Sequence, residues 1–181
     1  RASLVALAVP ARIRLGFDRA RAREGQWLVT NARIAPRERE HVLDSFFGFA
    51  RWFGIEDREL RWDLPLPPEA LEYAERLIPA DAGATGTLVI SPCSSHALRN
   101  WRPERYAAVA DHAVLRHGLR VILCGGPSAL ERRMAEAICA AARAPLVDQV
   151  GKDTLPQLLA LLGRATALVS PDSGPAHMAT M

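Results

Sequence analysis

Between residues 86 and 170, short apolar runs alternate with longer segments that have the periodicity of helices. The runs are rich in β-branched residues and are bounded by glycine, proline or polar residues, which is typical of buried strands. Strands and helices that alternate in this way build βαβ units, in which the strands are parallel and the crossovers right-handed. The sequence therefore predicts an α/β fold with a parallel sheet and helices on both faces. The expected strands are 86–91, 119–124, 145–150 and 166–170, and the expected helices are 103–118, 129–144 and 153–165.

The first 80 residues are less regular. Residues 12–17 and 26–30 have the composition of strands, and residues 40–54 carry apolar side chains at helical spacing. A proline-rich stretch, a short helix and a tract of small residues follow. Because the composition changes there, we expect a domain boundary near residues 80–85.

The composition is that of an ordinary soluble protein, with 181 residues of which 49% are hydrophobic and 24% charged. Acidic residues are interspersed among the basic ones and the net charge is +3, which argues against a nucleic-acid-binding tract. Cys93, Cys124 and Cys139 form no C-x-x-C pair, which favours a reducing compartment over a disulfide framework or a zinc site. No apolar stretch reaches the roughly 18 residues of a membrane span.

Polar residues follow the first strand of the expected sheet, where ligands of open parallel sheets bind. Ser94 and Ser95 offer hydroxyls and backbone N–H groups, and Arg99 offers a guanidinium fork that suits phosphate. The same stretch is also compatible with a polar loop in which Trp101 packs ahead of the next helix. Phosphate binding and a plain loop both remain open for this turn.

The second turn, "CGGPSALE" at 124–131, partly resembles a dinucleotide-binding turn. Two glycines follow a strand, and Asp148 lies about 20 residues further on, as in the dinucleotide fingerprint. However, the full G-x-G-x-x-G pattern is absent, and Pro127 lacks an N–H that a phosphate cradle would use. A tight strand-to-helix turn explains the stretch equally well.

The third turn, in "ALVSPDSGPAHMATM", follows the last expected strand. Asp172 or Ser173 can cap a helix there, and Gly174 allows a ligand to approach the backbone closely. The free N–H groups of such a helix start favour an anion such as a diphosphate, which the imidazole of His177 can also reach. Asp172 would repel phosphate, so a sugar hydroxyl or an amine suits it better. The alternative is an ordinary aspartate cap beside an exposed histidine.

Taken in order, these stretches resemble glycosyltransferase family 9, the ADP-heptose:lipopolysaccharide heptosyltransferases. The residues that carry the resemblance are "SPCSSHALRNWRPERYAAVADHAVLRHGLRVILCGGPSALE", the "GKDTLPQLLALL" stretch and "ALVSPDSGPAHMA". The segment "RLGFDRARAREGQWLVTNARIAPREREHVLDSFFGFARWFGI" also resembles the later part of that family's N-terminal domain. The resemblance implies a GT-B fold, with two Rossmann-like domains that are both incomplete in this chain. Residues 1–82 then form the later part of the acceptor-side domain plus a linker, and 83–181 the truncated nucleotide-sugar-binding domain.

The resemblance also implies a set of donor-binding residues. The two serines match hydroxyl residues that contact the donor phosphates, and Arg99 stands where the family commonly has a lysine. Glu131 matches an acidic residue that meets the nucleoside, while Cys93 replaces a glycine usual in the first loop. The D-[ST]-G-x-x-H turn of the family is matched by four residues that touch the donor sugar and diphosphate. The implied donor-binding residues are Ser94, Ser95, Arg99, Glu131, Asp172, Ser173, Gly174 and His177.

By the same resemblance, the catalytic base belongs upstream of Arg1 and further strands belong downstream of Met181. Asp18 follows a later strand of its domain and is not expected to be that base. We therefore expect an internal segment that lacks both ends and does not transfer sugar alone.

The function implied is an inverting, metal-independent transfer of heptose from ADP-heptose to a lipopolysaccharide core or lipid A acceptor. It implies no cofactor besides the donor and no nucleic-acid partner. The expected location is the cytoplasm, and a peripheral contact at the cytoplasmic face of the inner membrane is compatible with it. A nicotinamide-dependent oxidoreductase and a non-catalytic nucleotide-sugar-binding module are the alternatives.

Overall fold

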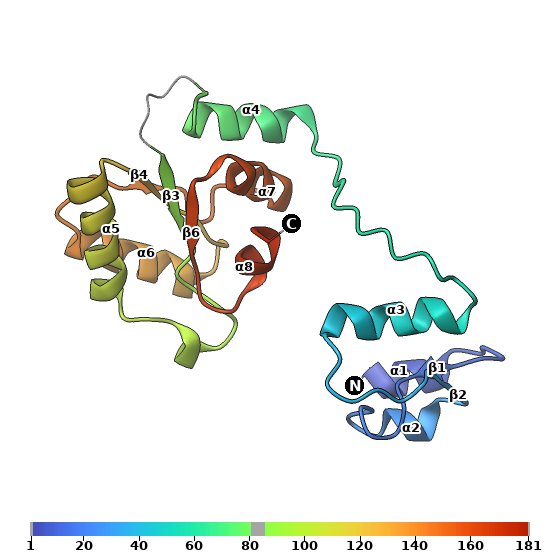
Figure 1. Ribbon diagram of the computed structural model, residues 1–181. Helices are drawn as coiled ribbons and strands as arrows, with labels where there is room; N and C mark the ends of the chain where they lie inside the picture. The colour runs from blue at the N-terminus through green and yellow to red at the C-terminus, as the bar shows by residue number, and fades with distance from the viewer. Residues whose placement is uncertain (1, 81–85, 181) are drawn as a thin grey trace. The chain divides into compact units, whose positions relative to one another are not determined.

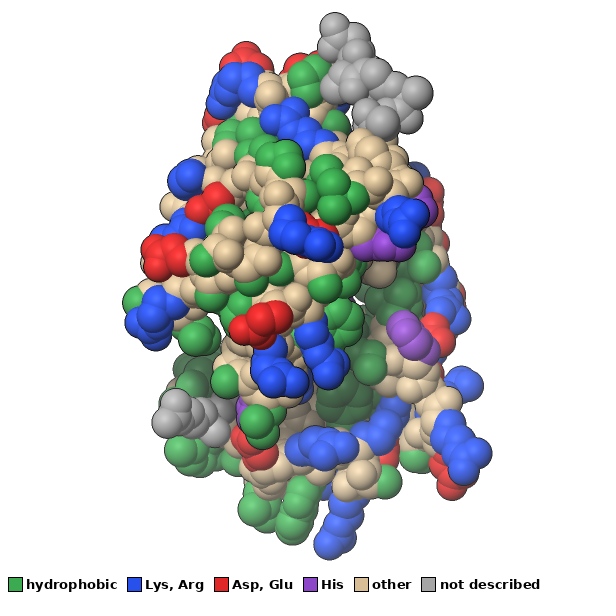
Figure 2. Space-filling model, turned by 90° about the vertical axis from the view of Figure 1, so that its left-hand side faces the viewer, with side chains coloured by type: hydrophobic (Ala, Val, Ile, Leu, Met, Phe, Trp, Pro, Cys, Tyr) green, Lys and Arg blue, Asp and Glu red, His purple; other side chains and the backbone are tan. Residues whose placement is uncertain are grey.

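The computed structural model describes residues 2–80 and 86–180, which form two compact units (Figure 1). One unit extends to Arg61 and the other begins at Trp62. On the face drawn in Figure 2, basic side chains are dispersed among acidic and apolar ones rather than gathered in one patch. No helix within the described ranges is long and apolar enough to cross a membrane.

The second unit is built around a parallel sheet of four strands in the order β5-β4-β3-β6. The strands are β3 (Thr87–Ile90), β4 (Arg120–Leu123), β5 (Val147–Asp148) and β6 (Ala167–Val169). Every neighbouring pair is parallel, which confirms the prediction made from the alternating pattern. β3 lies at the centre, with Ile90 opposite Leu123 on one side and Val169 on the other.

Helices cover both faces of this sheet (Figure 1). One face packs against α5 (Pro103–His117) and α6 (Ala129–Ala141), and the other against α7 (Leu155–Arg164) and α8 (Gly174–Met178). Each helix starts or ends where the sequence provides a signal, such as the left-handed Gly118 after α5 and the capping serine, Ser128, before α6. The three helices expected after residue 100 are therefore confirmed.

The core follows the two-residue period of the strands. Along β3, Leu88 and Ile90 join the cluster under α5 and α6, whereas Val89 joins the cluster under α7. Along β4, Leu123 faces α5 and α6, and Ile122 faces α7. Because both faces are covered, the last three residues of each strand are apolar and buried, unlike the alternating residues of a half-exposed strand.

The strand order creates a switch point between β3 and β6. The chain runs from β3 outward to β4 and β5, and α7 then returns it to the opposite side of β3. At such a point the two flanking connections leave in opposite directions, and a crevice opens beyond the carboxyl ends of the strands. The loops that bound this crevice are residues 91–102 after β3 and 170–173 after β6.

The boundary between the units lies earlier than the expected position near residues 80–85. α4 (Pro68–Leu77) packs against α7, with Ala70 and Ala74 buried against Ala160. The boundary after residue 82 is therefore a poor packing boundary, because α4 belongs to the second unit. The tract of small residues at 81–85 lies outside the described residues.

Over residues 2–61, the first unit contains a short parallel pair, β1 (Leu15–Gly16) with β2 (Ala32–Arg33), and three helices. These helices are α1 (Ala2–Ala8), α2 (Gln26–Val29) and α3 (Val42–Trp52). The strand expected within 12–17 and the helix expected within 40–54 are both present. The existence of a parallel pair also agrees with the predicted fold class.

The strand expected at 26–30 is wrong, because these residues form α2. Gly25 enters the helix with φ of 70°, and the Thr30 hydroxyl donates to the Gln26 carbonyl oxygen at 3.2 Å. The Val29 carbonyl oxygen accepts from Arg14 Nε at 2.9 Å instead of from a neighbouring strand. A short apolar run does not by itself distinguish a strand from a helical turn, and here the tertiary contacts decided the outcome.

Replacing Tyr106 with phenylalanine is expected to lower the free energy of unfolding by about 1–2 kcal/mol. The Tyr106 hydroxyl is buried, donates to the Pro92 carbonyl oxygen at 3.0 Å and accepts from the Trp101 N–H at 3.4 Å. Its loss leaves the buried carbonyl oxygen of Pro92 and the partly buried N–H of Trp101 without this partner. Urea unfolding measures the effect, with Tyr73→Phe as the control because its partner, the Gln149 side chain, can turn to water. Equal stability of Tyr106→Phe and the wild type would contradict this account of the loop.

Candidate functional site

Ser94 shapes the first loop of the crevice. Its backbone N–H donates to Asn100 Oδ1 at 2.8 Å, and its hydroxyl donates to the His96 carbonyl oxygen at 3.0 Å. The same hydroxyl accepts from the His96 N–H at 3.3 Å, so Ser94 holds a tight turn and is nearly buried. Ser95, the next residue, is exposed. Of the two serines expected to bind phosphate, Ser95 is therefore the one whose side chain faces solvent.

Arg99 and Asp172 meet across the crevice although 73 residues separate them in the sequence. Arg99 ends a short 3-10 helix, η1 (Ala97–Arg99), and its Nη1 lies 2.8 Å from Asp172 Oδ2. His177 approaches the same carboxylate, with Nε2 3.5 Å from Oδ1. The structure thus brings together three of the residues that the sequence assigned to one site.

Ser173 and Gly174 stand at the start of α8. Ser173 occupies the cap position, but its hydroxyl pairs with that of Ser170 at 2.7 Å rather than with the helix. A side chain at Gly174 would meet no heavy atom within 4 Å, so the space in front of this residue is open. The second loop therefore presents an uncluttered backbone next to the ion pair of Arg99 and Asp172.

Glu131 lies in the β4–α6 turn, and its carboxylate is engaged by the protein. It accepts from the Gly126 N–H at 2.7 Å and from the Ser128 hydroxyl at 2.6 Å. A Cβ at Gly126 would lie 2.9 Å from Glu131 Oε2, so the carboxylate would have to shift if this residue carried a side chain. Contact with a nucleoside remains a prediction for Glu131, whose contacts seen here brace the turn.

The spacing that imitates a dinucleotide fingerprint also has an internal explanation. Glu131 already occupies the Gly126 N–H that a pyrophosphate would use. Asp148, in the position of the ribose-binding acid, is paired with Arg132 and accepts from the Val150 N–H at 3.0 Å. The Gly126 N–H and the Asp148 carboxylate therefore both have partners within the protein, which does not favour the oxidoreductase alternative.

Asp153 is a residue that the sequence did not single out. Its Oδ2 atom is buried, and among the described residues it has no hydrogen-bond partner. Burial, followed by the negative charge of Glu131, raises the pKa of the Asp153 carboxyl to about 6. Asp153 in turn contributes to the raised pKa values of Tyr73 and Cys124, both about 12 and both due mainly to burial. The aspartate lies one residue before the Thr154 cap, so its sequence position suggested only an ordinary helix start.

Replacing Asp153 with asparagine is expected to stabilise the protein at neutral pH. The pKa of an aspartate carboxyl in an unfolded chain is about 3.9. Because the pKa of Asp153 is higher in the folded protein, the folded state keeps this carboxyl protonated up to a higher pH than the unfolded state does. Stability therefore falls as the pH rises from about 4 to about 6, and asparagine removes this decline. We expect a gain of about 1–2 kcal/mol at pH 7.5 and none at pH 4, measured by urea unfolding. Asp63→Asn, an exposed position, is the control; a gain independent of pH would contradict the assignment.

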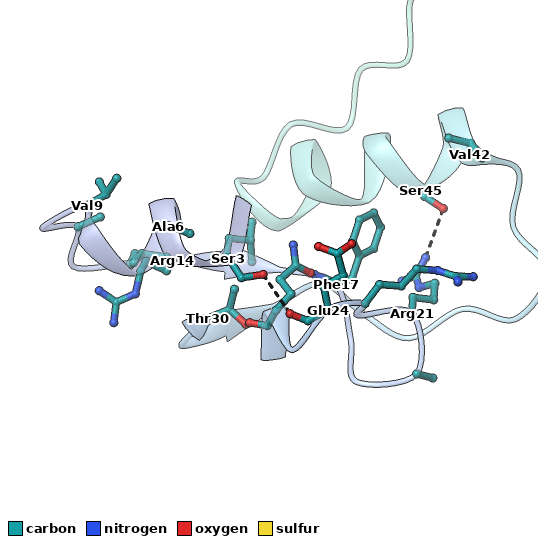
Figure 3. Close-up of a pocket in the computed structure, with 16 residues that line it drawn as sticks. Ser3, Ala6, Val9, Arg14, Phe17, Arg21, Glu24, Thr30, Val42 and Ser45 are labelled. Atoms are coloured by element: carbon teal, nitrogen blue, oxygen red, sulfur yellow. Dashed lines mark hydrogen bonds between the residues drawn. The ribbon is translucent and has the colours of Figure 1, made fainter. Parts of the chain in front are cut away.

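The first unit contains a separate pocket of about 860 Å³ (Figure 3). Figure 3 shows Arg21 pointing towards Ser45, at 3.5 Å, and Ser3 towards the carbonyl oxygen of Glu24, at 3.3 Å. Arg21 also binds Asp18, and hydrogen bonds from Arg21 and Ala20 lower the pKa of this carboxyl. An acid held in this way is poorly suited to be a general base, in agreement with the expectation for Asp18.

A four-stranded parallel sheet with an ion-paired polar crevice at its switch point defines a Rossmann-like unit. The chain belongs to glycosyltransferase family 9 (heptosyltransferase), because the sequence model of that family matches residues 1–181. The lipopolysaccharide core heptosyltransferase OpsX of Haemophilus influenzae is 39% identical over 180 residues, which are 99% of this chain and 51% of that protein. This confirms the family predicted from the sequence.

Solved structures confirm the predicted fold class. A family 9 glycosyltransferase from Veillonella parvula superposes with a TM-score of 0.75 at 21% identity, covering 98% of this chain and 50% of the other. The Escherichia coli heptosyltransferase WaaC with ADP gives a TM-score of 0.66 at 20% identity, covering 92% of this chain and 50% of the other. The chain therefore spans about half the length of the relatives that it matches.

Proposed function

We propose that this chain is part of a heptosyltransferase, with the donor bound by its second unit, that transfers heptose from an ADP-activated donor to a lipopolysaccharide core or lipid A acceptor. The proposal rests on the position of Arg99 at the switch point of the sheet, where its Nη1 lies 2.8 Å from Asp172 Oδ2. Membership of family 9 and 39% identity to a protein named lipopolysaccharide core heptosyltransferase support the choice of sugar and acceptor. The similarity to a heptosyltransferase solved with ADP supports the choice of nucleotide.

In this proposal the donor diphosphate lies in the crevice between the loops that follow β3 and β6. Arg99 donates hydrogen bonds to the phosphates, and Ser95 adds an exposed hydroxyl from the same loop. The open space at Gly174 lets the phosphates approach the second loop, and His177 reaches the same region. These groups stabilise the negative charge that develops on the departing diphosphate.

The transfer inverts the configuration of the sugar, and it needs neither a metal ion nor a further cofactor. A guanidinium and hydrogen-bond donors supply the charge stabilisation that a metal ion would otherwise provide. The described residues contain no group of three or more histidine, cysteine, aspartate or glutamate side chains arranged to hold a metal ion. The general base that takes the acceptor proton is assigned to none of the residues of this chain.

We also propose that the protein works in the cytoplasm, and that its first unit faces the acceptor. A lipopolysaccharide acceptor is anchored in a membrane, so the acceptor side approaches the cytoplasmic face of the inner membrane. In support of this, the first unit carries exposed apolar side chains on α1 and after α3, among them Leu4, Phe53 and Ile55. These side chains are of the kind that lie at membrane interfaces.

Titration of the chain with ADP, UDP and NAD by calorimetry tests the proposal. Saturable binding of ADP, with UDP and NAD at least about tenfold weaker, is the expected result. Preferential binding of NAD would favour the oxidoreductase alternative. Binding of none of the three would remove the crevice as a nucleotide site.

A further inference from the structure

Asp172 is a carboxylate within a site proposed for an anion. Its Oδ2 lies 2.8 Å from Arg99 Nη1, and its Oδ1 lies 3.5 Å from His177 Nε2. The pair connects the loop after β6 to the loop after β3, across the switch point. A carboxylate at this position neutralises much of the positive charge that a phosphate requires.

The stability of the fold does not explain this carboxylate. The side chains of Arg99 and Asp172 are 51% and 65% exposed, and ion pairs with such exposure contribute little to stability. The cap position of α8 belongs to Ser173, not to Asp172. Asp172 thus lowers the positive charge of the site with little structural benefit, which points to a role towards the ligand.

The charge of the ligand changes during the proposed transfer. The acceptor oxygen forms a bond to the anomeric carbon while the bond from that carbon to the β-phosphate oxygen breaks. The electron pair leaves with the phosphate oxygen, and the acceptor proton passes to the general base. The terminal phosphate of the released nucleoside diphosphate loses its remaining proton with a pKa of about 6, so the product carries more negative charge than the donor at neutral pH.

We propose that Asp172 makes the site select the sugar-linked donor over the free nucleoside diphosphate and thereby promotes release of the product. This inference rests on the proposed function. The added negative charge of the product forms beside the Asp172 carboxylate, and like charges placed together weaken binding. The donor instead presents sugar hydroxyls, which a carboxylate can accept as hydrogen bonds.

The test compares ADP with ADP-ribose, whose diphosphate is esterified at both ends as in a sugar donor. Both are titrated by calorimetry at pH 7.5 into the wild type and the Asp172→Asn variant. We expect Asp172→Asn to bind ADP about tenfold more tightly than the wild type, with the affinity for ADP-ribose changed less than about threefold. Glu136→Gln is the matched control, because Glu136 is also a 65% exposed carboxylate paired with an arginine.

Four results would overturn the inference. Equal tightening of ADP and ADP-ribose would show that Asp172 only lowers the positive charge of the site. Weaker ADP-ribose binding without a gain for ADP would show that Asp172 is only a sugar contact. Unchanged affinity of Asp172→Asn for both ligands would contradict the inference alone, whereas binding of neither ligand by the wild type would remove the proposed function together with the inference.

Discussion

Replacing Arg99 with alanine is expected to weaken ADP binding by about 1.5–3 kcal/mol, or about 10- to 150-fold in Kd. The guanidinium supplies charge-assisted hydrogen bonds at the switch point, where it now pairs with Asp172 at 2.8 Å. Its removal also leaves the Asp172 carboxylate unopposed beside the diphosphate, which adds repulsion to the lost attraction. Calorimetric titration with ADP measures the change.

Arg116→Ala is the matched control for this experiment. Arg116 is an exposed arginine in the last turn of α5, at the opposite end of that helix from the crevice, so the variant removes the same charge elsewhere. We expect its ADP affinity to stay within about twofold of the wild type. Thermal unfolding of both variants should match the wild type, since the ion pair of Arg99 is exposed. Equal ADP affinity of Arg99→Ala and the wild type would remove Arg99 from the site.

Replacing Leu161 with alanine is expected to lower the free energy of unfolding by about 2–5 kcal/mol. Leu161 of α7 is fully buried and packs in one cluster with Val89 of β3 and Ile122 of β4. The cavity left by alanine lies between the helix and both central strands of the sheet, where rigid neighbours limit collapse. Urea unfolding monitored by circular dichroism gives the difference.

Leu155→Ala provides the comparison on the same helix. Leu155 is the first residue of α7 and is 69% exposed, so its truncation is expected to change stability by less than about 0.5 kcal/mol. A similar loss in the two variants would contradict the placement of the core between α7 and the sheet. A loss in Leu161→Ala alone would support the layered packing on which the crevice depends.

The second unit was predictable because its signals are local and agree with one another. Apolar runs, caps and helical spacing each mark the same elements, such as α5 between Pro103 and Gly118. The order of the strands was not contained in these signals, since it depends on which side of β3 the chain takes after α7. The prediction of a strand at 26–30 was wrong because a short apolar run does not determine its own conformation. Residues 26–29 form a helix that follows the left-handed Gly25, and the Val29 carbonyl oxygen accepts a hydrogen bond from Arg14.

The candidate site was predictable in its location but not in its contacts. The rule that ligands bind beyond the carboxyl ends of parallel strands was enough to place Arg99 and Asp172 in one region. Their direct ion pair, and the use of Glu131 to brace its own turn, arise from side-chain geometry that a sequence does not show. The burial of the Asp153 side-chain oxygen could not be predicted either, because its surroundings include Tyr73 of α4, which is distant from Asp153 in the sequence.

Titration of the ¹⁵N-labelled chain with ADP, monitored through the chemical shifts of the backbone amides, tests whether the crevice between the ends of β3 and β6 binds the donor diphosphate. We expect saturable shifts that are largest at residues 94–99 and 172–177. Saturable shifts confined to the first unit, or no saturable shifts in either of these two loops, would contradict this expectation.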